Sequence, residues 1–186
     1  IRSCGYLPIV LPYEIDFKEY MEQLDIQGVI LTGGNDLNSV NENPLSKTRD
    51  NFEYELIEYC VSNKIPLFGI CRGMQMLNSY FGGTLQMINT PINHVSVNHE
   101  ILIEKESSSL FNSKNTFVVA SYHNYGIDKL GDGLIPLARS KDHLIESFQH
   151  KSHKIFGLMW HPERELHNGS ASDFHKNLFR RIIEEF

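Results

Sequence analysis

Apolar residues recur along this 186-residue chain at two spacings, and the dominant spacing changes near the middle. In the first half, helical patterns with apolar residues three and four positions apart alternate with short apolar runs typical of buried strands. We predict strands at Tyr6–Leu11, Gly28–Leu31 and Ile65–Ile70 and helices at Phe17–Leu24, Asp50–Val61 and Cys71–Phe81. The polar residues 35–48 indicate a surface loop. Alternation of strand and helix favours right-handed crossovers and a parallel sheet.

The second half is made of short apolar runs separated by turn residues, which predict an antiparallel extension of the sheet. These runs are Val95–Val97, Ile101–Ile103, Thr116–Ala120, Ile135–Ala138, Ile145–Phe148 and Ile155–Trp160. An amphipathic helix over Asp173–Phe186 ends the chain. The length suits one α/β domain spanning residues 1–186. The sequence begins without Met, and its first residues are typical of the end of a helix. We therefore expect a preceding strand and helix to be missing.

Composition and charge narrow the class of protein. Lys and Arg number 17 and Asp and Glu 23, so the net charge of −6 does not favour binding to a nucleic-acid backbone. No apolar run approaches the roughly 20 residues of a membrane span, and no signal peptide opens the sequence. We therefore expect a cytoplasmic protein without membrane association. Three cysteines at wide spacings do not indicate a disulfide framework.

Gly69-Ile70-Cys71-Arg72-Gly73 has the spacing of a nucleophile elbow, with Cys at the position of the nucleophile. A predicted strand precedes this motif and a predicted helix follows it. The helix N-terminus should lower the pKa of the Cys71 thiol and favour the thiolate. Cys4 and Cys60 are interpreted as small buried thiols, which is the ordinary environment of a free cysteine.

Trp160-His161-Pro162-Glu163 follows a predicted strand, so His161 should emerge at the edge of the sheet. A thiol nucleophile needs a general base, and Glu163 could accept a hydrogen bond from Nδ1 of His161 and orient it. A surface turn is the alternative. The other histidines are expected in solvent or to lack the close spacing of metal ligands, so no metal is predicted. They include His143, His150, His153, His167 and His175, together with the pairs His150-x2-His153 and His94-x4-His99.

Gly33-Gly34 closes a predicted central strand and exposes backbone N–H groups that could hold an oxyanion, with the Arg72 amide as second donor. A tight turn is the alternative for the two glycines. Gln75 lies one helical turn after Cys71, where it could contact a polar substrate or simply occupy the helix surface. A polar and aromatic loop at residues 121–126 carries little information by itself.

Together, Leu31–Asp36, Gly69–Gln75 and Trp160–Glu163 resemble the class I glutamine amidotransferase superfamily. Further segments resemble its gamma-glutamyl hydrolase-like branch, peptidase C26; they are Arg49-Asp50 with Glu53 and Leu56, Asn78-x2-Phe81–Leu85, and Ser121-x-His123-Asn124. The resemblance implies a flavodoxin-like three-layer α/β/α sandwich with a mostly parallel central sheet. It also implies a triad of Cys71, His161 and Glu163, with the Gly34 and Arg72 amides as oxyanion hole and no cofactor. The implied substrate contacts are Gly33, Gln75, Tyr122, His123, Asn124 and Tyr125, although Asn124-Tyr125 replaces the family's usual His-Gln.

The implied reaction is cleavage of a γ-glutamyl amide through a glutamyl thioester, with release of glutamate. One expected substrate is a small nucleotide-linked, CDP-activated glutamine of capsule biosynthesis. The pyrophosphate of this substrate could be bound by Lys47, Arg49 and Arg72. The alternatives are that Lys47 is a solvated surface residue and that Arg49 belongs to the start of a helix. The alternatives are a glutaminase subunit that delivers ammonia to a synthetase and a non-catalytic binding module. The sequence leaves open whether copies associate as a homo-oligomer.

Overall fold

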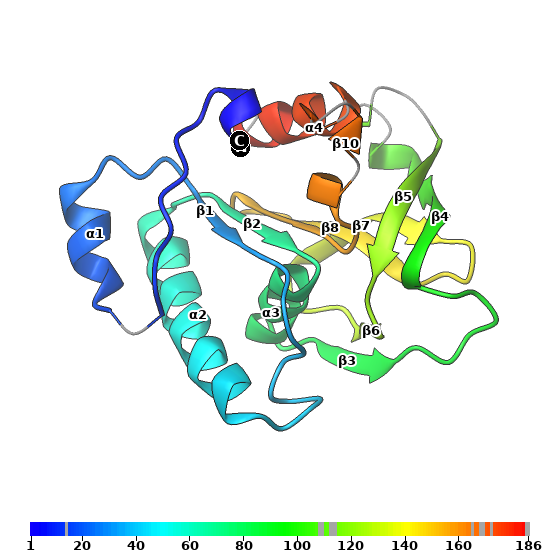
Figure 1. Ribbon diagram of the computed structural model, residues 1–186, viewed down its shortest axis with the longest axis horizontal. Coiled ribbons are helices and arrows are strands. Elements are labelled where there is room, and N and C mark those ends of the chain that lie inside the picture. The colour runs from blue at the N-terminus through cyan, green and yellow to red at the C-terminus, as the bar shows by residue number, and fades with distance from the viewer. Residues whose placement is uncertain are drawn as a thin grey trace.

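A seven-stranded mixed sheet lies at the centre of the computed structural model, with helices on both faces (Figure 1). The structure describes residues 1–13, 15–107, 110–111, 115–164, 166–167, 170–171 and 173–184, so Phe186 of the last predicted helix lies outside it. In chain order the elements are η1 (Arg2–Cys4), α1 (Phe17–Gln23), β1 (Val29–Leu31), α2 (Pro44–Asn63), β2 (Leu67–Ile70), α3 (Arg72–Tyr80), β3 (Thr84–Met87), β4 (Val95–Ile103), η2 (Lys105–Ser107), β5 (Thr116–Tyr122), β6 (Tyr125–Lys129), β7 (Leu134–Ser140), β8 (Ile145–His150), β9 (Ile155–Leu158), η3 (Pro162–Arg164), β10 (Leu166–His167), β11 (Ser170–Ala171) and α4 (Asp173–Glu184).

The strand order β1-β2-β9-β8-β7-β4-β5 brings both halves of the chain into one sheet. The pairs β1–β2 and β2–β9 are parallel, and the remaining pairs out to β5 are antiparallel. The predicted α/β fold with an antiparallel extension is confirmed, and its parallel part comprises three strands. Because Ile70 pairs in register with Leu158, the residues that follow β2 and β9 emerge at the same edge. This register places Cys71 and His161 on neighbouring strand ends.

Side chains on β2 and β9 alternate between two apolar clusters, one on each face of the sheet. Leu67 and Ile155 pack with α1, α2 and α3, whereas Phe68 and Phe156 stack on each other beneath α4. In Figure 1, α2 and α3 lie below the sheet and α4 lies above it. A three-layer sandwich, as predicted, requires two buried apolar clusters, one on each face of a single sheet, and the structure has both.

Helix α2 is longer than the periodicity predicts, because it begins at Pro44 inside the expected surface loop. Asn43 caps it by accepting a hydrogen bond from the Leu45 amide at 2.9 Å, and proline is well suited to the first helical turn. With 20 residues it is the longest helix described. Within the described ranges, no helix is both long and apolar enough to cross a membrane.

Two expectations for strands were wrong, and one pair of strands in this part of the chain was not predicted. Tyr6–Leu11 is not a strand in the structure, because no described segment pairs with it, and Val10 is 87% exposed. The two short strands predicted between residues 95 and 103 are a single strand, β4. Residues 84–87 and 125–129 form an unpredicted two-stranded sheet, β3–β6, beside α3.

Candidate active site

Cys71 occupies a strained position between β2 and α3. Its φ of 50° and ψ of −107° are unusual for a residue with a side chain, and its N–H donates to the Leu158 carbonyl at 2.7 Å. The turn is tight enough that a Cβ on Gly69 would lie 2.6 Å from the backbone of Gly73. A Cβ on Gly73 would collide in turn with the backbone of Leu31. The glycines of the motif therefore permit the close approach that the sequence predicts for a nucleophile elbow.

Burial dominates the electrostatics of the Cys71 thiol. With the residue only 7% exposed, burial raises its pKa to about 11, although a hydrogen bond from the Arg72 amide lowers it. Glu163 and Glu146 raise it further, and Arg164 opposes them. The expectation of a lowered thiol pKa was therefore wrong, because desolvation outweighs the helix N-terminus. The resting side chain is a thiol, which needs a base before it can act as a nucleophile.

His161 and Glu163 follow β9 and contact each other directly. The backbone N–H of His161 donates to the Ala120 carbonyl at 3.0 Å. The ring nitrogen Nδ1 of His161 lies 2.6 Å from Glu163 Oε1. Burial is the largest single influence and raises the Glu163 pKa, but the hydrogen bond from His161, a backbone hydrogen bond and the charges of His161 and Arg164 together lower it more, so the net pKa is below its ordinary value. Because an ionised carboxylate can only accept, Nδ1 must donate and Nε2 is left as the basic nitrogen.

Gly33 is located where the imidazole and the nucleophile approach each other. A Cβ at this position would lie 2.9 Å from His161 Cε1 and 3.8 Å from the Cβ of Cys71. The absent side chain therefore leaves room for the imidazole. The same geometry shows that the three predicted segments, after β1, β2 and β9, meet at one point. Gly34 follows, with a Cβ position blocked by the Arg49 guanidinium.

Arg49 and Arg72 belong to a buried ionic network under this loop. The Arg72 guanidinium is 1% exposed and pairs with both Asp50 and Glu53. Arg49 pairs with Glu53 at 2.7 Å and donates to the Thr32 carbonyl at 2.9 Å. The suggestion that Arg72 could meet a pyrophosphate was wrong, because its charge is buried between two carboxylates. Only its backbone N–H faces the thiol.

Several expected substrate contacts lie around His161 and α3. The Tyr122 ring meets His161 edge-to-face at 5.6 Å between centroids, and Arg164 lies 4.0 Å over the same ring. Arg164 was not identified from the sequence, since one exposed arginine after a motif gives no signal. Gln75 is buried, and its amide nitrogen donates to the Tyr125 carbonyl at 3.0 Å, which links α3 to β6.

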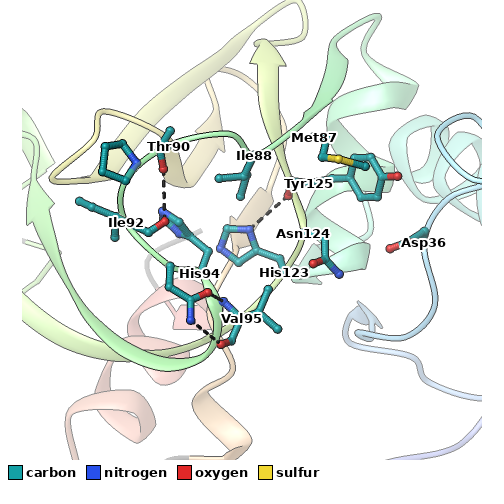
Figure 2. A pocket seen from close by; sticks show the side chains of 12 residues that line it. Asp36, Met87, Ile88, Thr90, Ile92, His94, Val95, His123, Asn124 and Tyr125 are labelled. Carbon is teal, nitrogen blue, oxygen red and sulfur yellow. Dashed lines mark hydrogen bonds between the residues drawn. The ribbon is translucent and has the colours of Figure 1, made fainter.

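The remaining expected contacts are divided between two cavities. Gly33, Gly34, His161 and Glu163 line a cavity of about 550 Å³ that extends beneath α4. A second cavity of about 510 Å³, shown in Figure 2, is lined by residues that include His123, Asn124 and Tyr125. Asn124 is exposed there, whereas His123 is 3% exposed and its Nε2 lies 3.6 Å from Glu146. Glu146, which is fully buried, was not identified from the sequence.

Two other histidines differ from their expected exposure. His150 and His175 are buried rather than solvated, and His175 Nε2 accepts a hydrogen bond from the Trp160 indole at 3.2 Å. His143 is exposed as expected, and the side chain of His167 lies outside the described part of the structure.

Comparisons with known proteins show the family and the fold of the chain. A model of the peptidase C26 family matches residues 1–163. The chain is 46% identical over 161 residues to gamma-glutamyl-CDP-amidate hydrolase of Campylobacter jejuni, which covers 87% of this chain and 73% of that protein. It is 30% identical over 185 residues to glutamine-hydrolyzing GMP synthase of Borreliella burgdorferi, covering 99% of this chain and 33% of the relative. A solved glutamine amidotransferase of Thermotoga maritima superimposes with a TM-score of 0.66 at 17% identity, over 83% of this chain and 78% of that one, and so shares its fold.

Proposed function

This chain belongs to the peptidase C26 family, and on that premise we propose that it is a hydrolase that cleaves a γ-glutamyl amide with Cys71 as nucleophile. The observation that carries the proposal is the meeting of three strand ends around Gly33. There a strained Cys71 lies at a helix N-terminus beside an imidazole whose other nitrogen is held by Glu163 at 2.6 Å. Nucleophile, base and orienting group in this relation suit acyl transfer.

The reaction follows from the positions of these groups. His161 Nε2 takes the thiol proton as Sγ of Cys71 attacks the γ-carbonyl, and the amides of Gly34 and Arg72 hold the oxyanion. The tetrahedral intermediate collapses to a thioester as His161 protonates the leaving nitrogen. Water, deprotonated by His161, then attacks the thioester, releases glutamate and restores the thiol. Glu163 stabilises the imidazolium in both halves of the reaction.

For the leaving group we propose a nucleotide-linked amidate, which would give the protein a cytoplasmic role in capsule biosynthesis. The support is the identity of 46% with a relative named for hydrolysis of gamma-glutamyl-CDP-amidate. The chain also has two cavities of about 510 and 550 Å³ lined by the expected contact residues, and a drug-sized ligand occupies a space of this order.

A panel of γ-glutamyl compounds tests both levels of the proposal. Glutamate release is measured from L-glutamine, from an N-substituted γ-glutamyl amide and from CDP-linked glutamine. We expect the highest kcat/KM for the CDP-linked compound and no turnover by Cys71→Ala. Cys60→Ala, which removes a thiol buried on α2 that lines neither cavity, should retain full activity. The absence of glutamate release from every compound would contradict the hydrolase and favour a binding module.

A glutaminase subunit is the second candidate. It is favoured by the 30% identity with a glutamine-hydrolyzing synthase over nearly the whole of this chain. In that case L-glutamine would have the highest kcat/KM, and addition of an acceptor synthetase would increase it further.

A further inference from the structure

Four buried side chains converge beside the β7–β8 turn, outside the proposed triad. His94 precedes β4, His99 lies within it, His123 follows β5, and Glu146 is the second residue of β8. Each is at most 9% exposed, and one ligand atom from each lies within 4.8 Å of all the others. Ser140, the last residue of β7, pairs with Ile101, so residues 95–100 of β4 extend beyond the end of β7, where His99 Nε2 lies 3.7 Å from Glu146 Oε1.

The hydrogen bonds around these four side chains leave one unprotonated ring nitrogen on each of His94 and His123, and both of these nitrogens face the Glu146 carboxylate. His94 Nε2 lies 3.0 Å from Asp142, and His123 Nδ1 lies 3.2 Å from the Tyr125 carbonyl, as the dashed line in Figure 2 shows. Both partners accept, so both nitrogens carry protons when the rings are neutral. His94 Nδ1 and His123 Nε2 then present lone pairs to Glu146, which is itself an acceptor.

With neutral rings, no hydrogen bond among the described residues supplies the missing donor. Both oxygens of Glu146, His94 Nδ1, His123 Nε2 and both ring nitrogens of His99 are buried without a hydrogen bond among the described residues. Buried polar atoms are rarely left without a partner, and a bare buried carboxylate is costly. A cation at the centre of the cluster would give these acceptor atoms a common partner.

From this geometry we propose that His94, His99, His123 and Glu146 bind one divalent transition-metal ion, with Zn²⁺ the best match. The three imidazole nitrogens lie 3.5, 3.7 and 3.6 Å from Glu146 Oε1. Metal–ligand bonds of about 2.0 Å in a tetrahedron place neighbouring ligand atoms about 3.3 Å apart. The distances to Glu146 are close to this value, and the four ligand atoms, all within 4.8 Å of one another, would draw together on binding the ion.

The surroundings of the cluster also suit a metal. Metal-bound histidines usually donate their second N–H to a carboxylate or a backbone carbonyl, as His94 does to Asp142 and His123 does to Tyr125. His94 and His123 line the 510 Å³ cavity, which provides an entry path. A proton on His94 could join its ring to Asp142 and Glu146, but it would leave the nitrogens of His99 unpartnered. One metal ion satisfies all four ligand atoms together.

The ion would act on the fold rather than on the reacting bond. Four protein ligands in a buried cluster are typical of a closed structural site. Such a site would tie β4, β8 and the segment after β5 together. That segment includes Tyr125, whose carbonyl also accepts from Gln75 on α3. We expect metal binding to stabilise the protein and to order the 122–125 segment.

Metal analysis of the full chain tests the proposal independently of any activity. After dialysis against a weak chelator, elemental analysis should find about one divalent transition-metal ion per chain, as one closed four-ligand site requires. Co²⁺ added to the stripped protein should give the visible absorption of a four-coordinate ion. Glu146→Gln should lose at least about 100-fold in affinity, and Asp142→Asn, which keeps all four ligands, about 10–100-fold. His143→Asn, in the same turn but exposed, should bind like the wild type.

His99→Leu distinguishes a cluster that binds a metal ion from one that does not, because the two cases predict different changes in Tm. Without a metal, replacing a buried imidazole that makes no hydrogen bond should raise Tm or leave it unchanged. With Zn²⁺ bound, the substitution should lower Tm, and a chelator should lower the Tm of the wild type but not that of the variant. The proposal is overturned if stripped wild-type protein binds neither Zn²⁺ nor Co²⁺, or if Zn²⁺ leaves its Tm unchanged.

Discussion

At the residue scale, the reactivity of Cys71 depends on the balance between burial and the groups that can remove its proton. Its pKa of about 11 means that about one chain in 10⁴ carries the thiolate at pH 7. A ligand with a γ-glutamyl group would bring the carbonyl to the sulfur and make proton transfer to His161 productive. A reagent without a γ-glutamyl group reacts only with the small fraction of chains in which Cys71 is a thiolate.

The first prediction concerns alkylation of Cys71 by iodoacetamide. Because only the thiolate reacts, the rate should rise about tenfold per pH unit from pH 7 to 10 and level off near the pKa of about 11. Peptide mass mapping of the Cys4→Ser variant isolates this site. Cys60, with a pKa raised by burial to about 12 and no exposed surface, should stay unmodified until the chain unfolds. A rate independent of pH between 7 and 9 would contradict the raised pKa.

The second prediction concerns Glu163, which acts on the substrate only through His161. Glu163→Gln keeps the size of the side chain but removes the charge that fixes the Nδ1–H tautomer and stabilises the imidazolium. We expect kcat to fall by about 10²–10⁴-fold with KM little changed, because the nucleophile and oxyanion donors are retained. Steady-state kinetics measure both parameters. A KM effect with normal kcat would assign Glu163 to substrate binding instead.

At the scale of elements, ion pairs between α2 and α3 hold these two helices together beneath Gly33 and Gly34. This packing holds the ends of β1, β2 and β9 around the site. Arg72 at the start of α3 pairs with Asp50 and Glu53 on α2, and Arg49 on α2 contacts the Thr32 carbonyl. Removing one member of a buried ion pair leaves the partner's charge without compensation. The network therefore controls both helix packing and the position of Gly33 and Gly34.

The third prediction tests that network. Arg72→Met, which retains an unbranched apolar stem, should lower the free energy of unfolding by about 3–5 kcal/mol, because Asp50 and Glu53 lose their shared partner. Urea denaturation followed by circular dichroism measures the change. Lys47→Ala replaces an exposed cation on α2, the helix that carries Asp50 and Glu53, and should change the free energy of unfolding by less than about 0.5 kcal/mol. A loss below about 1 kcal/mol for Arg72→Met would mean that the pairs contribute little.

The sequence predicted well those elements whose period and flanking residues act locally. Helix α3 and strands β2 and β9 were found because apolar periodicity and the glycines around Cys71 report local geometry. Pairing between distant segments was not visible in this way, so Tyr6–Leu11 was assigned a strand without a partner. The burial of Cys71 was missed for the same reason, since its cause is packing against Leu158 and Gly33 and not its neighbours in sequence.

At the scale of the whole molecule, the histidine cluster shows what sequence spacing could not reveal. His94 and His99 were considered as ligands and set aside for their spacing, because a metal site was sought on one rigid element. The structure brings together His94 just before β4, His99 within β4, His123 just after β5 and Glu146 on β8. Only the strand order, with β7 ending early between β4 and β8, brings them together.

The fourth prediction links the pH dependence of global stability to His175 on α4. Burial lowers the pKa of its imidazole from 6.5 to about 4, with Glu163 opposing. Between these values the unfolded chain binds a proton that the folded chain does not, so the free energy of unfolding must fall as pH is lowered. The shift corresponds to a loss of about 3 kcal/mol between pH 6.5 and pH 4. Fluorescence of Trp160, the single tryptophan and the hydrogen-bond donor to His175, reports unfolding.

His175→Gln separates this contribution from the carboxylates that titrate in the same range. Gln keeps an acceptor for the indole N–H but does not titrate, so the wild type should lose about 3 kcal/mol relative to this variant between pH 6.5 and 4. Above pH 7 the difference between the two proteins should be constant, because His175 is neutral in both states. His143→Asn, at an exposed position, should follow the wild-type curve throughout. Parallel curves for wild type and His175→Gln would show that His175 is protonated equally in the folded and unfolded chains, and that α4 does not shield it from solvent.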